Sequence, residues 1–187
     1  GGTWSDTVDR TLANNLTMTA SSTIAGGAGV DFIFTSDTIG GTSGTLTLDN
    51  TANAGAMSVA FSGTGFTFAR PIAFADAFTE LRFSDATGTQ TFTGAITGAG
   101  RVVHDGAGTT VLSSGSNNFS GGLTLAAGTV AAGSNTALGS GAITFAGGGV
   151  SGSGAARTLA NALVLAGDGT ASGAQNLIFS GGFTQTG

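Results

Sequence analysis

The feature that most constrains this chain is an internal repeat, because repetition at an interval of 20 to 50 residues is typical of solenoids and other repeat folds. A Phe, a small residue and usually a Gly recur six times along the sequence. The Phe residues of these six marks are Phe34, Phe61, Phe92, Phe119, Phe145 and Phe179. Their mean separation is about 29 residues, which is a usual length for one unit of a stacked repeat protein.

Each interval usually holds three short clusters of β-prone apolar residues, such as 66–68, 72–74 and 81–83. Many clusters alternate apolar residues with Thr or small residues, as a strand does when one face is buried. Turns rich in Gly, Asn, Asp and Ser separate them. We predict an all-β fold, a parallel β-helix (β-solenoid) of about six rungs of ~29 residues with three short strands each. An antiparallel β-sandwich would share the short strands but does not require the repeat.

A longer repeat relates the two ends of the chain. Residues 10–16, RTLANNL, resemble residues 157–163, RTLANAL, at an offset of 147. Residues 148–187 therefore restart the pattern of residues 1–40. We expect one β-solenoid segment over residues 1–187 that ends within a repeat and is part of a longer repeat protein.

Composition excludes several classes of function. The chain has five Arg and no Lys against ten acidic residues, and nucleic-acid affinity depends largely on basic side chains. Without Lys there is no phosphate-binding loop of the G-x-x-x-x-G-K type and no Schiff base. Without Cys there is no disulfide and no thiolate metal site. No apolar run approaches the ~18 residues of a membrane-spanning helix.

Residues 108–130, GTTVLSSGSNNFSGGLTLAAGTV, carry a denser motif. Its main parts are Asn117-Asn118-Phe119-Ser120-Gly121-Gly122 and Gly128-Thr129-Val130, and residues 137–141, ALGSG, continue it. This segment resembles the autotransporter-associated β-strand repeat of bacterial autotransporter passenger domains. The resemblance is clear over residues 92–187 and fainter over residues 1–91. It implies a right-handed parallel β-helix that is exported to the cell surface or beyond.

The sharpest local motif is 26–34, GGAGVDFIF, which fits the calcium-binding nonapeptide G-G-x-G-x-D-x-U-x at every fixed position. Such a site gathers six or more oxygen ligands from successive copies of the motif. Here the motif occurs once. We therefore predict a Gly-rich corner without a metal, in which Asp31 is the one candidate calcium ligand.

Charged residues gather most densely in one stretch, at Arg70, Asp76, Glu80, Arg82 and Asp85. Grouped carboxylates with basic neighbours occur in polysaccharide-cleaving β-helices. This cluster lacks His and Lys, however, and Arg82 lies between two apolar residues as an exposed strand position does. We interpret the cluster as a solvated face.

Two further residues are weighed as functional candidates. His104 precedes Asp105, but neighbouring residues of a strand point to opposite faces and no nucleophile accompanies them, so we expect only a turn after Val102 and Val103. Trp4, the only Trp, is expected to fill the interior instead of forming a sugar-stacking platform. The sequence thus predicts no catalytic residue, no cofactor and no enzyme.

Three functions fit these observations. The first is a structural segment of a bacterial extracellular or cell-surface filament, sheath or stalk, which self-associates end to end through its terminal rungs. The second is an adhesin or passenger that binds a cell-surface or matrix ligand. The third is a carbohydrate-active β-helix, for which the loops look too short to form a groove. Low charge and abundant Thr favour the first, because a weakly charged strand ladder stacks readily on itself.

Overall fold

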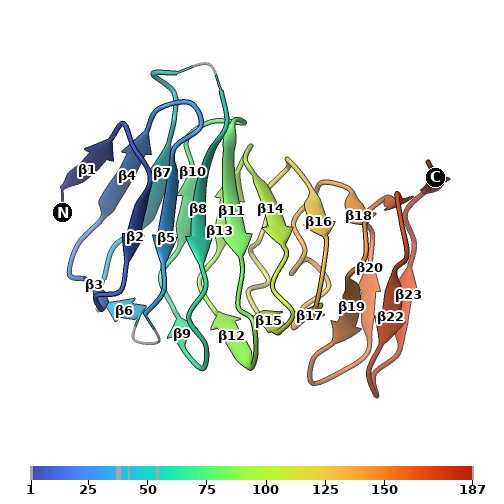
Figure 1. Cartoon of the computed structure of the whole chain (residues 1–187). Coiled ribbons are helices and arrows are strands. Elements are labelled where there is room, and N and C mark those ends of the chain that lie inside the picture. The colour runs from blue at the N-terminus through green and yellow to red at the C-terminus, as the bar shows by residue number, and fades with distance from the viewer. Residues whose placement is uncertain (1, 37–38, 42, 54, 187) are drawn as a thin grey trace.

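The fold is a parallel β-solenoid, seen in a computed structural model that describes residues 2–36, 39–41, 43–53 and 55–186 (Figure 1). The ends of the predicted unit, Gly1 and Gly187, lie outside these residues. The described chain forms 24 short strands and no helix. Every strand pairing is parallel. The predicted fold class is therefore confirmed.

Three faces surround the interior, and the chain visits them in the same order in each turn. Face 1 contains β1 (Thr3–Asp6), β4 (Ser22–Gly26), β7 (Leu46–Asp49), β10 (Ile72–Phe74), β13 (Ile96–Gly98), β20 (Arg157–Leu159) and β23 (Leu177–Phe179). Face 2 contains β2 (Arg10–Leu12), β5 (Asp31–Phe34), β8 (Met57–Phe61), β11 (Thr79–Phe83), β14 (Arg101–His104), β16 (Leu123–Leu125), β18 (Ile143–Phe145), β21 (Leu163–Leu165) and β24 (Phe183–Gln185). Face 3 contains β3 (Leu16–Met18), β6 (Ile39–Gly41), β9 (Thr67–Phe68), β12 (Thr89–Phe92), β15 (Thr109–Leu112), β17 (Thr129–Ala132), β19 (Gly149–Gly152) and β22 (Thr170–Ser172).

The turns are shorter and more numerous than the sequence predicted. The nine strands of face 2 form one continuous sheet, so about eight turns separate β2 from β24. One turn takes 20 residues where Gln90 pairs with Thr110, and 27 residues where Asp31 pairs with Ser58. The predicted rungs are therefore too few and too long, although three strands per rung is right for most turns.

The error comes from the Phe marks, which do not occupy the same place in each rung. Phe61 ends a strand of face 2, Phe92 ends a strand of face 3, and Phe119 lies in the segment that follows on face 1. Phe34 and Phe61 pair directly, one turn apart, whereas each later pair of successive marks is separated by a full turn plus part of the next. The mean spacing between the marks is therefore longer than one turn, and dividing the length of the chain by this spacing gives too few turns.

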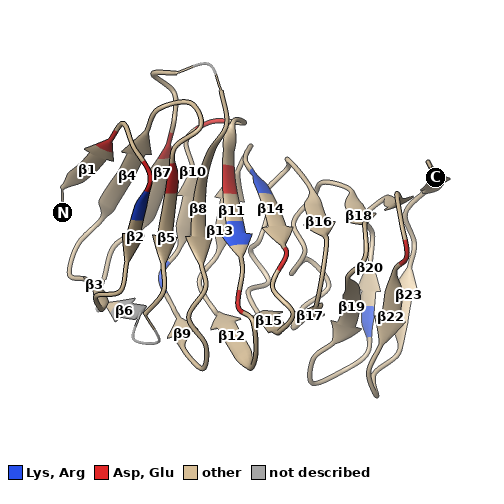
Figure 2. Cartoon of the chain, viewed as in Figure 1, with Lys and Arg blue, Asp and Glu red and all other residues tan. Residues whose placement is uncertain are grey.

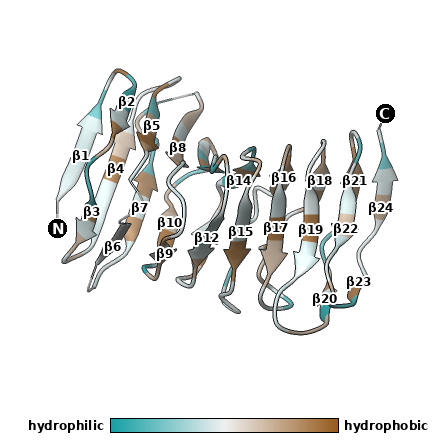
Figure 3. Cartoon of the chain, turned by 60° about the horizontal axis from the view of Figure 1, so that its bottom comes forward, coloured by the Kyte–Doolittle hydropathy of each residue, from teal (hydrophilic) through white to brown (hydrophobic). Residues whose placement is uncertain are grey.

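The core is a set of side-chain columns that the parallel register aligns from rung to rung. One column of face 2 contains Phe32, Val59, Leu81, Val102, Leu123, Ile143, Leu163 and Phe183. The other contains Phe34, Phe61, Phe83, His104, Leu125, Phe145, Leu165 and Gln185. Figure 3 shows hydrophobic colour mainly on the strands and hydrophilic colour mainly at the turns.

Aromatic rings fill the N-terminal half of this interior. The ring centroids of Phe34 and Phe61 lie 5.5 Å apart in a stacked arrangement, and those of Phe83 and Phe92 lie 4.6 Å apart. Phe32, Phe61, Phe83 and Phe92 are buried. Burial of such rings, roughly 1.5–3 kcal/mol each, supplies the main driving force for closing these turns.

Face 1 continues between β13 and β20 without assigned strands, and a buried Asn side chain adds to the backbone hydrogen bonds that remain there, such as those from Asn118 to Ile96 and from Ser120 to Gly98. Asn117 Oδ1 accepts a hydrogen bond from the backbone N–H of Ile96 at 2.8 Å, and its Nδ2 donates to the carbonyl of Ala137 at 2.6 Å. One side chain therefore connects the rung before it with the rung after it. This geometry gives the Asn-Asn-Phe motif a physical reason, since Phe119 packs in the core and Asn118 is exposed.

Replacing Asn117 by Ala should destabilise the fold by roughly 2–4 kcal/mol, because two buried backbone groups would lose their partner. The neighbouring Asn118→Ala is the matched control and should change stability by no more than about 0.5 kcal/mol, since its side chain is exposed. Urea unfolding followed by circular dichroism measures both. Equal shifts of the two unfolding midpoints would contradict the bridging role of Asn117.

Candidate functional site

The first turn contains an apolar hollow at the β1 end of the solenoid. Its volume is about 340 Å³, and its lining includes Trp4, Leu12, Leu16 and Phe34. The Trp4 ring packs edge-on against Phe32, with ring centroids 5.1 Å apart and planes at 72°. Trp4 therefore contributes to the interior, as predicted, and it forms the wall of a hollow that no described residue fills.

The opposite end also exposes core positions. Phe183 belongs to the inward column of face 2, where it pairs with Leu163. Val102 and Ile143 of the same column are fully buried, whereas Phe183 is 63% exposed. The difference arises because no described strand covers the outer side of β24.

The two ends are complementary in their backbone as well. Within the described residues, β1 pairs only with β4, and β24 pairs only with β21. Each end strand thus presents one row of N–H and C=O groups to the outside, as an edge strand does. Since every pairing inside the described solenoid is parallel, the two edges match the two sides of an ordinary rung interface.

A charge network covers the outer side of face 2. Glu80 Oε1 accepts from Arg82 Nη1 at 2.8 Å, and Glu80 Oε2 accepts from Arg101 Nε at 2.5 Å. Arg82 Nη2 also donates to Asp105 Oδ2, and Ser84 Oγ donates to Asp105 Oδ1 at 2.6 Å. Figure 2 shows these charges together on β11, on β14 and in the turn after β14.

The structure brings together only part of the predicted charge cluster. Glu80 and Arg82 belong to the network on face 2, but Arg70 lies in the turn between β9 and β10. Asp76 accepts from the backbone N–H groups of Asn50 at 2.6 Å and Phe78 at 2.7 Å, so it holds a corner. Asp85 is fully buried, and its assignment to a solvated face is therefore wrong.

The prediction missed Arg101 and Asp105, the other two members of the network. Glu80 pairs directly with Arg101 in the strand register, 21 residues later. The longer repeat predicted from the Phe marks does not bring these positions together, whereas the true turn does. A search for opposite charges separated by one true turn would have found this pair.

His104 faces the interior, opposite to Asp105. It ends the strand β14 instead of lying in a turn, and both the His104 and the Asp85 side chains are 0% exposed. The two face each other, with 3.7 Å between His104 Nε2 and Asp85 Oδ1. His104 Nδ1 lies 2.8 Å from the carbonyl of Ala127 and donates to it. The predicted separation of His104 from Asp105 is confirmed, and the predicted turn is wrong.

Burial governs the chemistry of Asp85. Loss of hydration raises the pKa of the Asp85 carboxyl above its ordinary value of 3.8, and the nearby His104 offsets part of this effect. Among the described residues no group lies at ordinary hydrogen-bond distance from either carboxylate oxygen of Asp85, although Thr110 and nearby backbone N–H groups also lower its pKa in part. A buried pair of this kind has no access for a substrate, so its role lies in the core.

The candidate calcium ligand Asp31 lies on face 2. Its Oδ1 accepts from Ser58 Oγ at 2.6 Å, and its backbone N–H donates to Asp9 Oδ1 at 3.0 Å. Gly29 in the same corner has a φ of +77°, which favours Gly. Among the described residues, no group of three or more Asp, Glu or His side chains is arranged to hold a metal ion.

The fold defines the chain as a parallel β-solenoid. Comparison of the chain with known proteins identifies no relative. No family model matches the sequence, and neither the curated proteins nor the solved structures contain a significant match. In the described part of the chain, no helix could span a membrane.

Replacing Asp85 by Asn should make stability less sensitive to a rise in pH. Because the folded chain holds the Asp85 proton more tightly than the unfolded chain, this group's contribution is complete below the ordinary pKa of 3.8 and is lost as pH rises through the raised folded pKa. The stability of Asp85→Asn relative to the unchanged chain should therefore increase with pH. Thermal unfolding between about pH 3 and about pH 7 measures this trend.

Asp49→Asn provides a control, because its stability relative to the unchanged chain should change with pH in the opposite direction. Hydrogen bonds from the backbone and hydroxyl of Thr51 lower the pKa of Asp49, so its carboxylate stabilises the fold above the ordinary value and this contribution is lost as pH falls. The relative stability of Asp49→Asn should thus decrease as pH rises. The same trend in both variants would contradict the buried environment of Asp85.

Proposed function

We propose that this chain is a structural repeat segment of a bacterial extracellular or cell-surface β-solenoid protein, and that it extends a filament, sheath or stalk by stacking of rungs. The observation that carries the proposal is the open, apolar interior at both ends. The hollow beside Trp4 and the exposed Phe183 are both parts of the core that one further rung would cover. The proposal assigns the segment no catalytic role and no cofactor.

Stacking would satisfy two requirements of the terminal rungs at once, and the low charge of the chain would not oppose it. A further parallel strand on β1 or β24 would use the unpaired row of backbone groups. A ring such as that of Phe183 would be removed from water, which favours association by roughly 1.5–3 kcal/mol. The rungs carry few charges, with a net charge of −5 over the whole chain, so repulsion between stacked ends would be small.

The cellular location rests on the sequence alone. The resemblance of residues 108–130 to the autotransporter-associated repeat supports export to the bacterial surface. The absence of Cys is compatible with any redox environment. The stacking proposal does not depend on this location.

The alternative function is that of an adhesin or passenger that binds a cell-surface or matrix partner. One observation favours it: face 2 carries a charge network, and the exposed ring of Phe78 lies in the turn just before β11, on the side of the solenoid instead of its end. Side and end surfaces can be tested separately, because each contains one strongly exposed Phe.

Replacing Phe183 by Asp should weaken end-to-end association at least about tenfold, because it places a charge where an apolar ring would be buried. Phe78→Asp is the matched control, since Phe78 is 57% exposed but lies away from the ends, and it should leave association unchanged. Sedimentation velocity over a range of protein concentrations measures both. A monomer at all concentrations, or association lost only in Phe78→Asp, would contradict the proposal.

A further inference from the structure

The outward surface of β8 is recessed relative to the neighbouring strands β5 and β11, because its outward side chains are shorter than theirs. Its outward side chains, Ser58 and Ala60, are small. The register places Asp31 and Ile33 of β5 beside them on one side, and Glu80 and Arg82 of β11 on the other side. Ser58 and Ala60 are 9% and 4% exposed although they point outward, because the longer neighbours shield them. A groove therefore runs along β8, and we call it the β8 groove.

One hollow lies in this groove, and a second lies just beyond the start of β8. One has a volume of about 320 Å³ and extends over Ser58 and Ala60 to Arg82 and Asp105. The other has a volume of about 390 Å³ and lies where β8 and β11 begin, beside Phe78 and Arg101. Each hollow is within the size range of small-ligand sites. The groove is made by strand side chains, so short loops do not preclude it, contrary to the expectation from the sequence.

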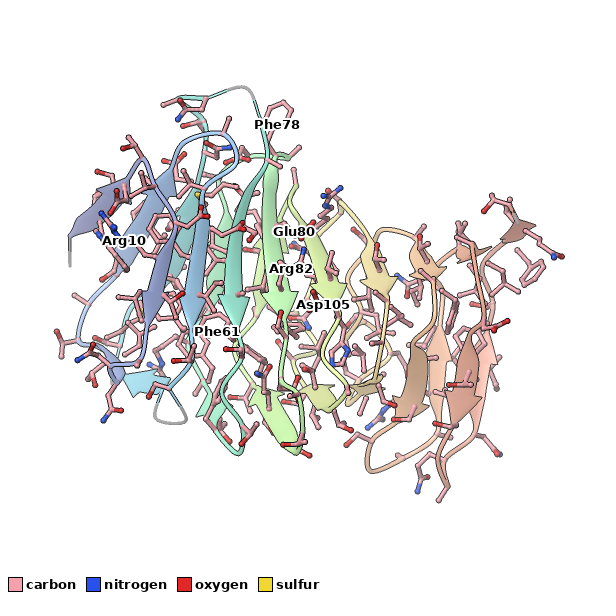
Figure 4. The ribbon with its side chains drawn as sticks, viewed as in Figure 1. Arg10, Phe61, Phe78, Glu80, Arg82 and Asp105 are labelled. Carbon is pink, nitrogen blue, oxygen red and sulfur yellow. The ribbon has the colours of Figure 1, made fainter. Side chains whose placement is uncertain are left out.

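The walls of the β8 groove combine an aromatic face with fixed polar groups. Phe78 is 57% exposed at the upper end of the groove, and Glu80, Arg82 and Asp105 follow below it (Figure 4). Arg101 donates a hydrogen bond to Glu80 from its Nε atom only. Among the described residues no other hydrogen bond of the Arg101 guanidinium is found, so its Nη groups are available as donors. The remaining carboxylate and hydroxyl groups pair with one another and are held in place.

This set of groups restricts the class of ligand. The backbone of β8 pairs with β5 and β11 on both sides, so an extended peptide cannot join the sheet there. Three carboxylates, those of Asp31, Glu80 and Asp105, outnumber the two guanidinium groups and disfavour a polyphosphate. A sugar hydroxyl both donates and accepts hydrogen bonds, so it matches adjacent carboxylates, hydroxyls and guanidinium groups.

We propose that the β8 groove binds a linear oligosaccharide that lies along β8, with one sugar ring against the ring of Phe78. Arg101 donates to oxygens of that sugar, and the pairs Asp31–Ser58 and Ser84–Asp105 contact the hydroxyls of the sugars that follow. The five residues of β8 span roughly 17 Å, which accommodates a short run of sugar rings. The site binds without cleaving, and it is independent of the terminal rungs.

The test is titration of the isotope-labelled chain with cellohexaose, xylohexaose and trigalacturonate, followed by NMR. At least one probe should bind and shift the amide signals of β8 and β11. Phe78→Ala should weaken binding roughly tenfold, and Ala60→Phe, which fills the floor of the groove, should abolish it. Phe183→Ala, the control with an exposed Phe at the end of the solenoid, should bind as the unchanged chain does.

Three outcomes would overturn the proposal. The first is that none of the three probes binds. The second is binding that survives both Phe78→Ala and Ala60→Phe. The third is tighter binding of a polyglutamate peptide, which supplies carboxylates without sugar rings. Circular dichroism and thermal unfolding establish whether Phe78→Ala and Ala60→Phe fold. The two substitutions change different parts of the groove, so if one variant misfolds, the other still tests the proposal.

Discussion

The structure depends on the register of its parallel ladder. Because each strand pairs with its counterpart one turn later, every inward residue stacks on an inward residue of the next rung. The column from Phe32 through Leu123 to Phe183 is one result. The same register aligns outward residues, and it places Glu80 beside Arg101 and keeps small side chains on β8 between larger ones. Core, charge network and groove therefore have one cause.

Polar side chains also lie inside the solenoid, both beside stretches without assigned strands and, in the case of His104, within a continuous sheet. Asn117 adds two hydrogen bonds where face 1 has no assigned strands, and Gln90 donates to the carbonyls of Phe61 and Gly63 at 2.8 and 2.7 Å. His104 replaces an apolar residue in a core column and faces Asp85. Asn117 and Gln90 bind interior backbone groups, among them the carbonyls of Ala137 and Gly63, and leaving such a group without a partner costs more than a hydrogen bond gains. Asp85 faces His104 at 3.7 Å without a close hydrogen bond, so core packing and charge are in conflict there.

The sequence was sufficient to predict the class of fold, because alternation at period two and Gly-rich turns report local structure directly. It was insufficient for the length of a rung, because Phe61, Phe92 and Phe119 mark corners of different faces. This error spread to the charged residues: with the longer predicted turn, Glu80 and Arg101 do not meet, and Asp85 looks exposed. Burial of Asp85 and the depth of the β8 groove depend on contacts across rungs, which local pattern does not reveal.

The central claim is that rungs in this register continue across the ends of the chain, and that the molecule serves mainly as a length of solenoid. Electron micrographs of the purified chain at high concentration test it most directly. The account predicts unbranched rods one solenoid wide, with a spacing of about 4.8 Å between strands along the rod. Isolated short particles at every concentration, or sheets formed by side-to-side packing, would contradict it.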